Sequence, residues 1–183
     1  TLSLHDALPI LEKQIIRPFV SLEHKTVSVR RVIDGDTIEV SATESGVTTK
    51  QVVRLLGIDA PEIFDASGHI TVLGITSKNY LSSLLENKKI ELQFDTDSID
   101  KYGRALAYVS LDNGADVQRE LLLQGLAYVY RAFPVAKLEE YEGYEAIAKA
   151  QKLGIWSSVE KKNFYEAKEQ EQEKGQYLKL QFP

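Results

Sequence analysis

The sequence predicts an α+β fold with a mainly β core. Three consecutive segments alternate apolar and polar side chains with the period of two that is typical of half-buried strands, and two more such segments follow. Between the third and fourth segments, and again after the fifth, apolar residues recur at helical spacing. With 183 residues and a hydrophobic fraction of 43%, the chain is long enough to form one domain around a substantial core.

The composition excludes several classes of site. The 22 Lys and Arg residues are outnumbered by 27 Asp and Glu residues, so the net charge is −5 and the overall basic surface of many nucleic-acid-binding proteins is missing. The absence of cysteine excludes disulfides and thiolate metal sites. No apolar run approaches the roughly 18 residues that span a bilayer. A polyanionic ligand would therefore have to be held by local cations or by a metal ion bound to carboxylates.

Three parts are expected along the chain. Residues 1–23 are an N-terminal extension without the basic start and long apolar segment of a signal peptide. Because its opening resembles a translated sequencing adapter, we expect it to be non-native or disordered and the natural N-terminus to be missing. Residues 24–157 are the predicted domain. Residues 158–183 are a charged tail, helical or disordered, in which residues 177–182 alternate like a strand.

The first three predicted strands form an antiparallel meander. In the first strand, the side chains expected on one face are Val27, Val29, Arg31 and Ile33. A tight turn at Asp34-Gly35-Asp36 leads into the second strand, because Gly tolerates positive φ and Asp accepts hydrogen bonds from its own backbone. The three strands are expected at residues 26–33, 36–43 and 50–58.

Helices and strands are mixed in the rest of the chain. A helix is expected at residues 75–85, followed by strands at 90–94 and 104–111 with a polar loop at 95–103. Asp116 is the expected N-cap of a short helix that stops at Gly125, and residues 137–153 form an amphipathic helix. The aromatic residues between positions 128 and 133 and Trp156 are expected in the core, although one of the tyrosines is also suited to stacking on a base. Five strands in a curled sheet with a helix between the third and fourth are typical of an OB-type β-barrel, here with three helices.

Charged residues gather at the ends of three predicted strands. Residues 34–37 begin the second strand, residues 54–62 end the third because Pro61 cannot donate to a strand ladder, and residues 100–104 begin the fifth. Carboxylates close to arginines indicate chemistry on an anionic substrate. Taken singly, the Asp-Gly-Asp segment is also explained as a turn, and Arg54 as the partner of Glu39 in a surface ion pair worth roughly 0–1 kcal/mol.

Taken together, the motifs resemble the staphylococcal nuclease (thermonuclease) family from about residue 25 to residue 156. Ile-Asp-Gly-Asp-Thr, Arg-Leu-x-x-Ile-Asp-x-Pro-Glu and Asp-Lys-Tyr-Gly-Arg occur in the family's order and spacing, followed by Gln-Gly-Leu-Ala and Gly-Ile-Trp. The resemblance implies an OB-type barrel and a calcium-dependent nuclease. Such an enzyme hydrolyses phosphodiester bonds of DNA and RNA with little sequence preference and leaves 3′-phosphates.

The resemblance also assigns a metal site and a residue for the attacking water. Asp36 and Asp59 match carboxylates that bind Ca²⁺, and the backbone carbonyl of Ala60 matches a third ligand. Oxygen ligands suit Ca²⁺, which keeps waters among its roughly 6–8 positions. Glu62 matches the residue that activates or positions the water. Ala60 replaces the family's usual Thr, but only its carbonyl is needed.

The resemblance also implies which residues bind the substrate. Arg54 and Arg104 match two catalytic guanidinium groups on the scissile phosphate, whose planar forks suit bidentate contact and stabilise developing charge. Lys101 and Tyr102 match positions near a terminal phosphate. The loop at residues 63–74 lacks the lysines of the best-known member, so the resemblance does not predict strong electrostatic binding of the substrate.

Two other functions remain open from the sequence. A non-catalytic OB-type module would bind nucleic acid without cleaving it, but such modules typically lack the acids or the arginines that are present here. A phosphodiesterase specialised for a small nucleotide or for nucleic-acid ends is the third possibility. For the nuclease, we expect DNA and RNA as partners, with single-stranded or frayed regions preferred, no membrane and no obligate protein partner. The resemblance favours a secreted or cell-envelope location.

Overall fold

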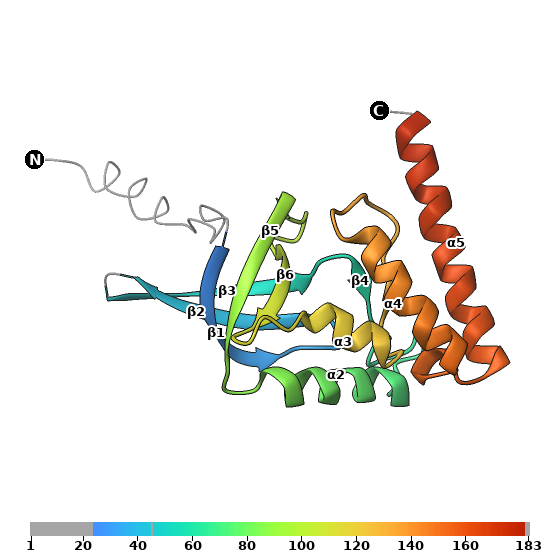
Figure 1. Ribbon diagram of the computed structural model, residues 1–183, viewed down its shortest axis with the longest axis horizontal. Helices are drawn as coiled ribbons and strands as arrows, with labels where there is room; N and C mark the ends of the chain where they lie inside the picture. Colours follow the sequence, from blue (N-terminus) through green and yellow to red (C-terminus); the bar gives the residue numbers. More distant parts are fainter. Residues whose placement is uncertain (1–23, 45, 182–183) are drawn as a thin grey trace, which may run out of the picture.

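Five strands close into a barrel in the order β1-β2-β3-β6-β5 in the computed structural model, which describes residues 24–44 and 46–181 (Figure 1). The strands are β1 His24–Val32, β2 Thr37–Glu44, β3 Val47–Leu55, β5 Lys89–Ile99 and β6 Ala105–Leu111. Strands β3 and β6 are parallel, whereas the other neighbours are antiparallel. Because the sheet closes on itself, it has no free edge. The predicted α+β fold with a five-stranded barrel is confirmed.

A β-bulge changes the expected face of the first strand. Val29 pairs with Val40, but the next pair joins Arg31 to Glu39, so Arg30 is an additional residue in β1. The bulge shifts the alternation of side chains, and Arg31 is exposed rather than on the core face. The prediction that Arg31 shares a face with Val27 and Val29 was therefore wrong.

The barrel interior is filled by the apolar residues of the alternating strands. Val40, Val53, Leu92 and Ala107 are all fully buried in one hydrophobic cluster. Such packing removes apolar surface from water at about 25 cal/mol per Å². Strand β5 continues to Ile99, so the polar loop expected at residues 95–103 is shorter than predicted, because strand β6 offers backbone partners as far as Ala105.

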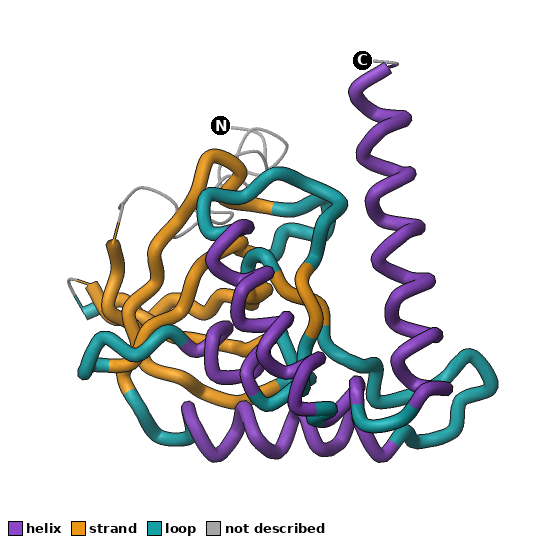
Figure 2. The backbone as a smooth tube through the Cα atoms, turned by 45° about the vertical axis from the view of Figure 1, so that its right-hand side comes forward, coloured by secondary structure: helices purple, strands orange, loops and turns teal. Residues whose placement is uncertain are grey.

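Helices cover the barrel on one side and at one end (Figures 1 and 2). Asp116 caps α3 as expected, since its carboxylate accepts a 2.9 Å hydrogen bond from the backbone N–H of Arg119. The helices are α2 Val72–Leu85, α3 Val117–Leu123, α4 Leu138–Gln151 and α5 Val159–Gln181, with a 3₁₀ turn η2 at Gly154–Trp156. None of these helices combines the length and apolar composition needed to cross a bilayer, within the residues that the structure describes.

The tail forms the helix α5 instead of ending in a strand. The backbone is helical as far as Gln181, so the strand expected at residues 177–182 was wrong over its described part. A run of Glu, Lys and Gln favours a helix, and a strand would have needed a partner. Tyr165 of α5 is buried against Trp156 of η2, so the helix is attached to the domain. The expectations for residues 1–23 fall outside the described residues.

Candidate active site

The site lies where strands β2 and β3 meet a second, two-stranded sheet. After β3, Gly57 adopts φ +82, a conformation that glycine adopts readily, and the chain continues into β4 Ile58–Asp59. Strand β4 pairs with β7 Tyr128–Val129, and Asp59 lies opposite Tyr128. The backbone N–H of Leu55 donates to the carbonyl of Asp36 over 2.8 Å. These contacts bring Asp36, at the start of β2, close to Asp59.

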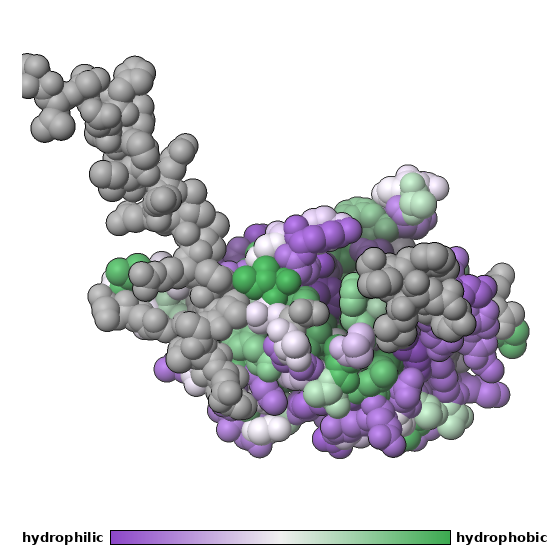
Figure 3. Space-filling model, turned by 90° about the horizontal axis from the view of Figure 1, so that it is seen from above, coloured by the Kyte–Doolittle hydropathy of each residue, from purple (hydrophilic) through white to green (hydrophobic). Residues whose placement is uncertain are grey.

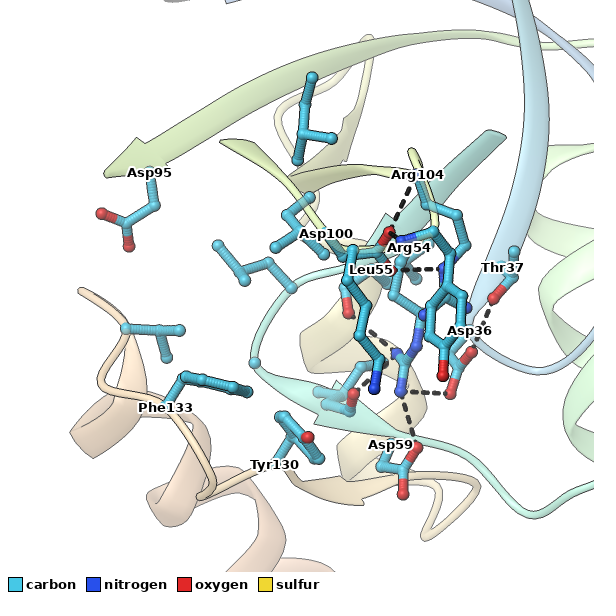
Figure 4. A pocket seen from close by; sticks show the side chains of 18 of the residues that line it. Asp36, Thr37, Arg54, Leu55, Asp59, Asp95, Asp100, Arg104, Tyr130 and Phe133 are labelled. Carbon is cyan, nitrogen blue, oxygen red and sulfur yellow. Dashed lines mark hydrogen bonds and ion pairs between the residues drawn. The ribbon is translucent and has the colours of Figure 1, made fainter. Parts of the chain in front are cut away.

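One guanidinium joins the two carboxylates. Nη2 of Arg54 lies 2.6 Å from Oδ1 of Asp59 and 3.1 Å from Oδ2 of Asp36 (Figure 4). Nη1 of Arg54 donates to the backbone carbonyls of Leu55 and Ile58 over 3.1 and 2.8 Å. The alternative partner Glu39 lies elsewhere, paired with arginines of β1. The alternative of a surface ion pair between Arg54 and Glu39 was therefore wrong, because Arg54 pairs with Asp36 and Asp59 instead.

Asp36 is a buried carboxylate with well-defined partners. Its Oδ2 accepts a 2.7 Å hydrogen bond from the N–H of Ala60, and its Oδ1 accepts one from the hydroxyl of Thr37 over 3.0 Å. Burial is the main reason that the pKa of Asp36 is raised to about 7, and the carboxylates of Asp34 and Asp59 add to this against the opposing charge of Arg54. Without a further cation, this acid therefore retains its proton to an unusually high pH.

Ala60 is positioned by a close contact between three backbone segments. A Cβ atom at Gly35 would lie 2.7 Å from the Cβ of Ala60 and 2.7 Å from the Cβ of Ser77 in α2, so only glycine fits there. The hydroxyl of Ser77 donates to the carbonyl of Leu126 and is itself fully buried. Ala60 is buried and its N–H binds Asp36, but it is not among the residues that line the pocket.

Arg104 reaches the same pocket from β6. The turn before it is organised by Asp100, whose Oδ1 accepts hydrogen bonds from the N–H groups of Tyr102 and Arg104, each over 2.9 Å. The other oxygen of Asp100 accepts from Nε of Arg104 over 2.7 Å. Lys101 and Tyr102 lie beside it, with the Lys101 ammonium 5.0 Å from the Tyr102 ring centre. Asp100 was not singled out from the sequence, although it belongs to the motif that identified Arg104.

Glu62 is held by its backbone and leaves its side chain exposed. Its carbonyl accepts a hydrogen bond from the hydroxyl of Thr71, the N-cap of α2. A Cβ atom at Gly74 would clash with the same carbonyl, so the first turn of α2 packs directly against this segment. Glu62 therefore lines the pocket as an exposed residue on a fixed backbone.

All seven predicted side chains line one pocket of about 1180 Å³. These residues are Asp36, Arg54, Asp59, Glu62, Lys101, Tyr102 and Arg104. In total, six acidic and three basic side chains line the pocket. Tyr130 and Phe133, which were expected in the core, also line it and lie across from Arg104 in the view of Figure 4. The pocket thus contains two arginines but has an excess of acidic side chains.

Tyr128 is a site residue that the sequence did not reveal. Its ring is buried as expected, but its hydroxyl donates to Oδ2 of Asp59. Burial, with the charge of Asp59, raises the pKa of Tyr128, so the hydroxyl keeps its proton and acts as a donor. An aromatic residue in an apolar stretch is normally assigned to the core, and no sequence pattern distinguishes this tyrosine from its neighbours.

The residues present suit a hard divalent cation. Asp34, Asp36 and Asp59 lie close to Arg54 and all act on its pKa, so three carboxylates are balanced by one guanidinium. Carboxylate and carbonyl oxygens are the ligands that Ca²⁺ prefers. Within residues 24–44 and 46–181, no group of three or more His, Asp or Glu side chains is arranged to hold a metal ion by itself. A cation would therefore be held by two carboxylates, with backbone, water or substrate oxygens completing its coordination.

Comparisons with known proteins found a matching family and several relatives. Residues 52–158 match the family described as staphylococcal nuclease homologue. The chain is 35% identical to the thermonuclease of Staphylococcus hyicus over 136 residues, which are 73% of this chain and 77% of that protein. It is 40% identical over 136 residues to endonuclease YncB of Bacillus subtilis, and 34% identical over 159 residues to endonuclease YhcR of the same organism.

The lengths of these relatives differ greatly. The matched part covers 72% of this chain but 61% of YncB, and 82% of this chain but 13% of YhcR. The matched part of this chain therefore spans less than two thirds of YncB and a small part of YhcR.

Proposed function

Because the chain belongs to the staphylococcal nuclease homologue family, we propose that it is a calcium-dependent nuclease that hydrolyses phosphodiester bonds of DNA and RNA with little sequence preference. One observation carries the proposal: Arg54, Arg104 and Glu62 line the same pocket as Asp36 and Asp59. These residues come from separate strands and a loop, and turn-forming or surface roles would not require them to converge. Residues 24–157 would be the catalytic domain.

The two arginines would bind the scissile phosphate. Arg54 is fixed by two backbone carbonyls and two carboxylates, so its position does not depend on the substrate. Arg104 is held through Nε by Asp100, and this leaves its terminal nitrogens to face a ligand. Guanidinium groups placed in advance stabilise the charge that develops on a pentacoordinate phosphorus. Lys101 and Tyr102 would contact a terminal phosphate.

Glu62 would hold and deprotonate the attacking water. Glu62 lines the pocket, is exposed and has a fixed backbone, which suits a general base acting on a water molecule. The attack would break the bond from phosphorus to the 5′ oxygen and leave a 3′-phosphate. A bound Ca²⁺ would supply Lewis-acid polarisation of a phosphate oxygen, and Asp36, Asp59 and the Ala60 carbonyl are the groups that would hold it.

The charge of the pocket supports dependence on a cation. Six acidic side chains against three basic ones would repel a phosphodiester in the absence of a metal ion. The same excess of acid argues against the alternative of a non-catalytic module, because such a module must attract nucleic acid without help. Tyr130 and Phe133 offer aromatic surface for unpaired bases, which supports a preference for single-stranded or frayed regions.

Incubating linear plasmid and RNA with the protein in Ca²⁺ or in EGTA tests the proposal. Cleavage is expected in Ca²⁺ and should disappear with chelation. Glu62→Gln and Arg104→Ala should each lower kcat by at least roughly 10²-fold, which is the scale of general-base and charge-stabilising groups. Glu171→Gln, at an exposed position of α5, is the matched control and should cleave like the wild type. If the wild type binds nucleic acid but does not cleave it, the proposed nuclease activity is refuted. If cleavage persists in EGTA, the proposed dependence on Ca²⁺ is refuted.

A further inference from the structure

The hydroxyl of Tyr128 donates a hydrogen bond to Oδ2 of Asp59 and so helps to orient this carboxylate. Oδ1 of Asp59 is occupied by Arg54, and Oδ2 accepts the hydrogen bond from Tyr128. Tyr128 is 1% exposed, so the donor of this hydrogen bond is buried. Both oxygens of the carboxylate are therefore oriented by the protein before any ligand arrives. Removing the donor would leave Asp59 held on one side only.

A helix outside the matched family region holds the ring of Tyr128. The family match ends at residue 158, and α5 begins at Val159. Tyr165 of this helix packs on Tyr128, with ring centres 5.3 Å apart, and on Trp156 at 6.2 Å. It is 6% exposed. The aromatic contact therefore links α5 to the residue that orients Asp59.

Polar contacts set the position of α5 on the domain. Glu169 accepts from Nζ of Lys149 over 3.0 Å and lies 3.2 Å from Nη1 of Arg131. The side chain of Gln172 accepts a 3.0 Å hydrogen bond from the backbone N–H of Arg131. Tyr165, Glu169 and Gln172 are spaced along one face of the helix. This face meets α4 and the segment that follows β7, and Tyr128 lies in β7 itself.

We propose that Tyr128 is a positioning residue for the metal-binding carboxylate of Asp59, and that α5 holds it in place through Tyr165. The inference rests on the proposed metal site and deepens it: the helix at the end of the domain becomes a support for cation binding. Hydrogen bonds that orient a ligating carboxylate typically contribute 10- to 100-fold to metal affinity. The hydroxyl of Tyr128 and the ring of Tyr165 have separate roles, so single substitutions distinguish them.

Calorimetric titration of Ca²⁺ into metal-free protein tests these roles without substrate. Tyr128→Phe, which removes only the hydroxyl, should weaken Ca²⁺ binding roughly 10-fold. Tyr165→Leu should weaken it in the same direction, whereas Tyr165→Phe, which keeps the ring, should bind like the wild type. Tyr141→Phe is the matched control, because it removes a buried hydroxyl that donates to the Asp116 carboxylate over 3.0 Å outside the site. It should lower the unfolding midpoint without changing Ca²⁺ affinity.

The outcomes separate this inference from the proposed function. If Tyr128→Phe binds Ca²⁺ within twofold of the wild type, or if Tyr141→Phe weakens binding equally, the positioning role is refuted while nuclease activity stands. If Tyr165→Leu alone binds normally, the role of α5 is refuted. If the wild type binds Ca²⁺ but cleaves no nucleic acid, the proposed function fails and the Tyr128 comparison still decides the inference. A wild type that binds no Ca²⁺ refutes both.

Discussion

Nη2 of Arg54 lies 2.6 Å from Oδ1 of Asp59, five residues further along the chain. The same nitrogen is 3.1 Å from Asp36, and the Arg54 side chain is only 14% exposed. One guanidinium thus neutralises two carboxylates that would also bind a cation. Partly buried charges of this kind are sensitive to the loss of a partner. Arg54 therefore has two opposing roles, since it restrains the acids but repels a metal ion placed between them.

Replacing Arg54 should change cation binding and cleavage in opposite directions. Arg54→Gln removes a positive charge beside Asp36 and Asp59, so Ca²⁺ should bind at least roughly 10-fold more tightly, because one close charge contributes up to about 4 kcal/mol at an effective dielectric constant near 20. Cleavage should fall by at least about 10²-fold because a phosphate ligand is lost. Calorimetry and a nuclease assay at saturating Ca²⁺ measure the two effects.

Arg104→Gln provides the comparison for this experiment. Arg104 is paired with Asp100, and neither residue contacts Asp36 or Asp59 in the described structure. It should therefore lower cleavage while leaving Ca²⁺ affinity nearly unchanged. Equal Ca²⁺ affinities for Arg54→Gln and the wild type would contradict the arrangement of charges.

Calcium affinity should depend on pH through Asp36. The folded, metal-free protein holds this proton up to a pKa of about 7, above the ordinary value of 3.8, whereas metal binding needs the ionised form. Ca²⁺ affinity should therefore decrease as the pH falls below 7, by up to about tenfold per pH unit. The folded state binds more protons than the unfolded state between these values, so the same group makes the metal-free protein less stable as the pH rises through this window.

Proton release measures this effect directly. Titrations of Ca²⁺ at pH 6 in buffers of different ionisation enthalpy should show close to one proton released per ion, and those at pH 8 should show almost none. Identical affinity and no proton release at both pH values would show that Asp36 is already ionised in the metal-free protein.

Glu145 is expected to be essential for the stability of the α4–β7 contact. It is 2% exposed and accepts from the N–H of Val129, from Arg131 and from Lys149 over 2.7, 2.7 and 2.9 Å. Burial acts to raise its pKa, but the hydrogen bonds from Arg131 and Val129 hold it below the usual value. Glu145→Gln should lower the free energy of unfolding by about 3–5 kcal/mol, measured by urea denaturation.

The matched control replaces a second carboxylate, Glu142, that pairs with the same arginine, Arg131. Glu142 pairs with Nε of Arg131 over 3.1 Å but is 45% exposed. Glu142→Gln should change the free energy of unfolding by no more than about 1 kcal/mol, because exposed ion pairs contribute little. Similar losses for both variants would show that the burial of Glu145 has no particular importance.

Gly35 and Gly143 should respond in opposite ways to alanine. A Cβ atom at Gly35 would meet Ala60 and Ser77 at 2.7 Å, so Gly35→Ala should destabilise the protein by about 1–3 kcal/mol and displace the Ala60 backbone. Gly143 lies within α4 with no atom within 4 Å of a built Cβ, so Gly143→Ala should stabilise it by about 0.5–1 kcal/mol. Thermal unfolding measures both, and a tolerated Gly35→Ala would contradict the close contact.

The barrel and most of the pocket could be predicted because they depend on local patterns. Alternation along β2 and β6 reports directly which side chains face the core, and the N-cap at Asp116 follows from local hydrogen bonding. The pocket residues stand in short motifs at strand ends, where the chain must turn. Arg31 was assigned to the wrong face of β1 because the alternating sequence pattern does not reveal the bulge, which adds one residue to the strand.

The sequence by itself determined the fold class, the family and the identity of six of the nine charged residues that line the pocket. Only the tertiary structure decided which of them touch: Arg54 pairs with Asp36 and Asp59, and Tyr128 binds Asp59. The docking of the tail helix α5 also depends on tertiary contacts. Its buried face contains Tyr165 and Glu169 and has no apolar stripe that the sequence pattern would reveal. Hydrophobic periodicity registers how apolar each residue is, whereas these contacts depend on hydrogen bonds between residues far apart in the chain.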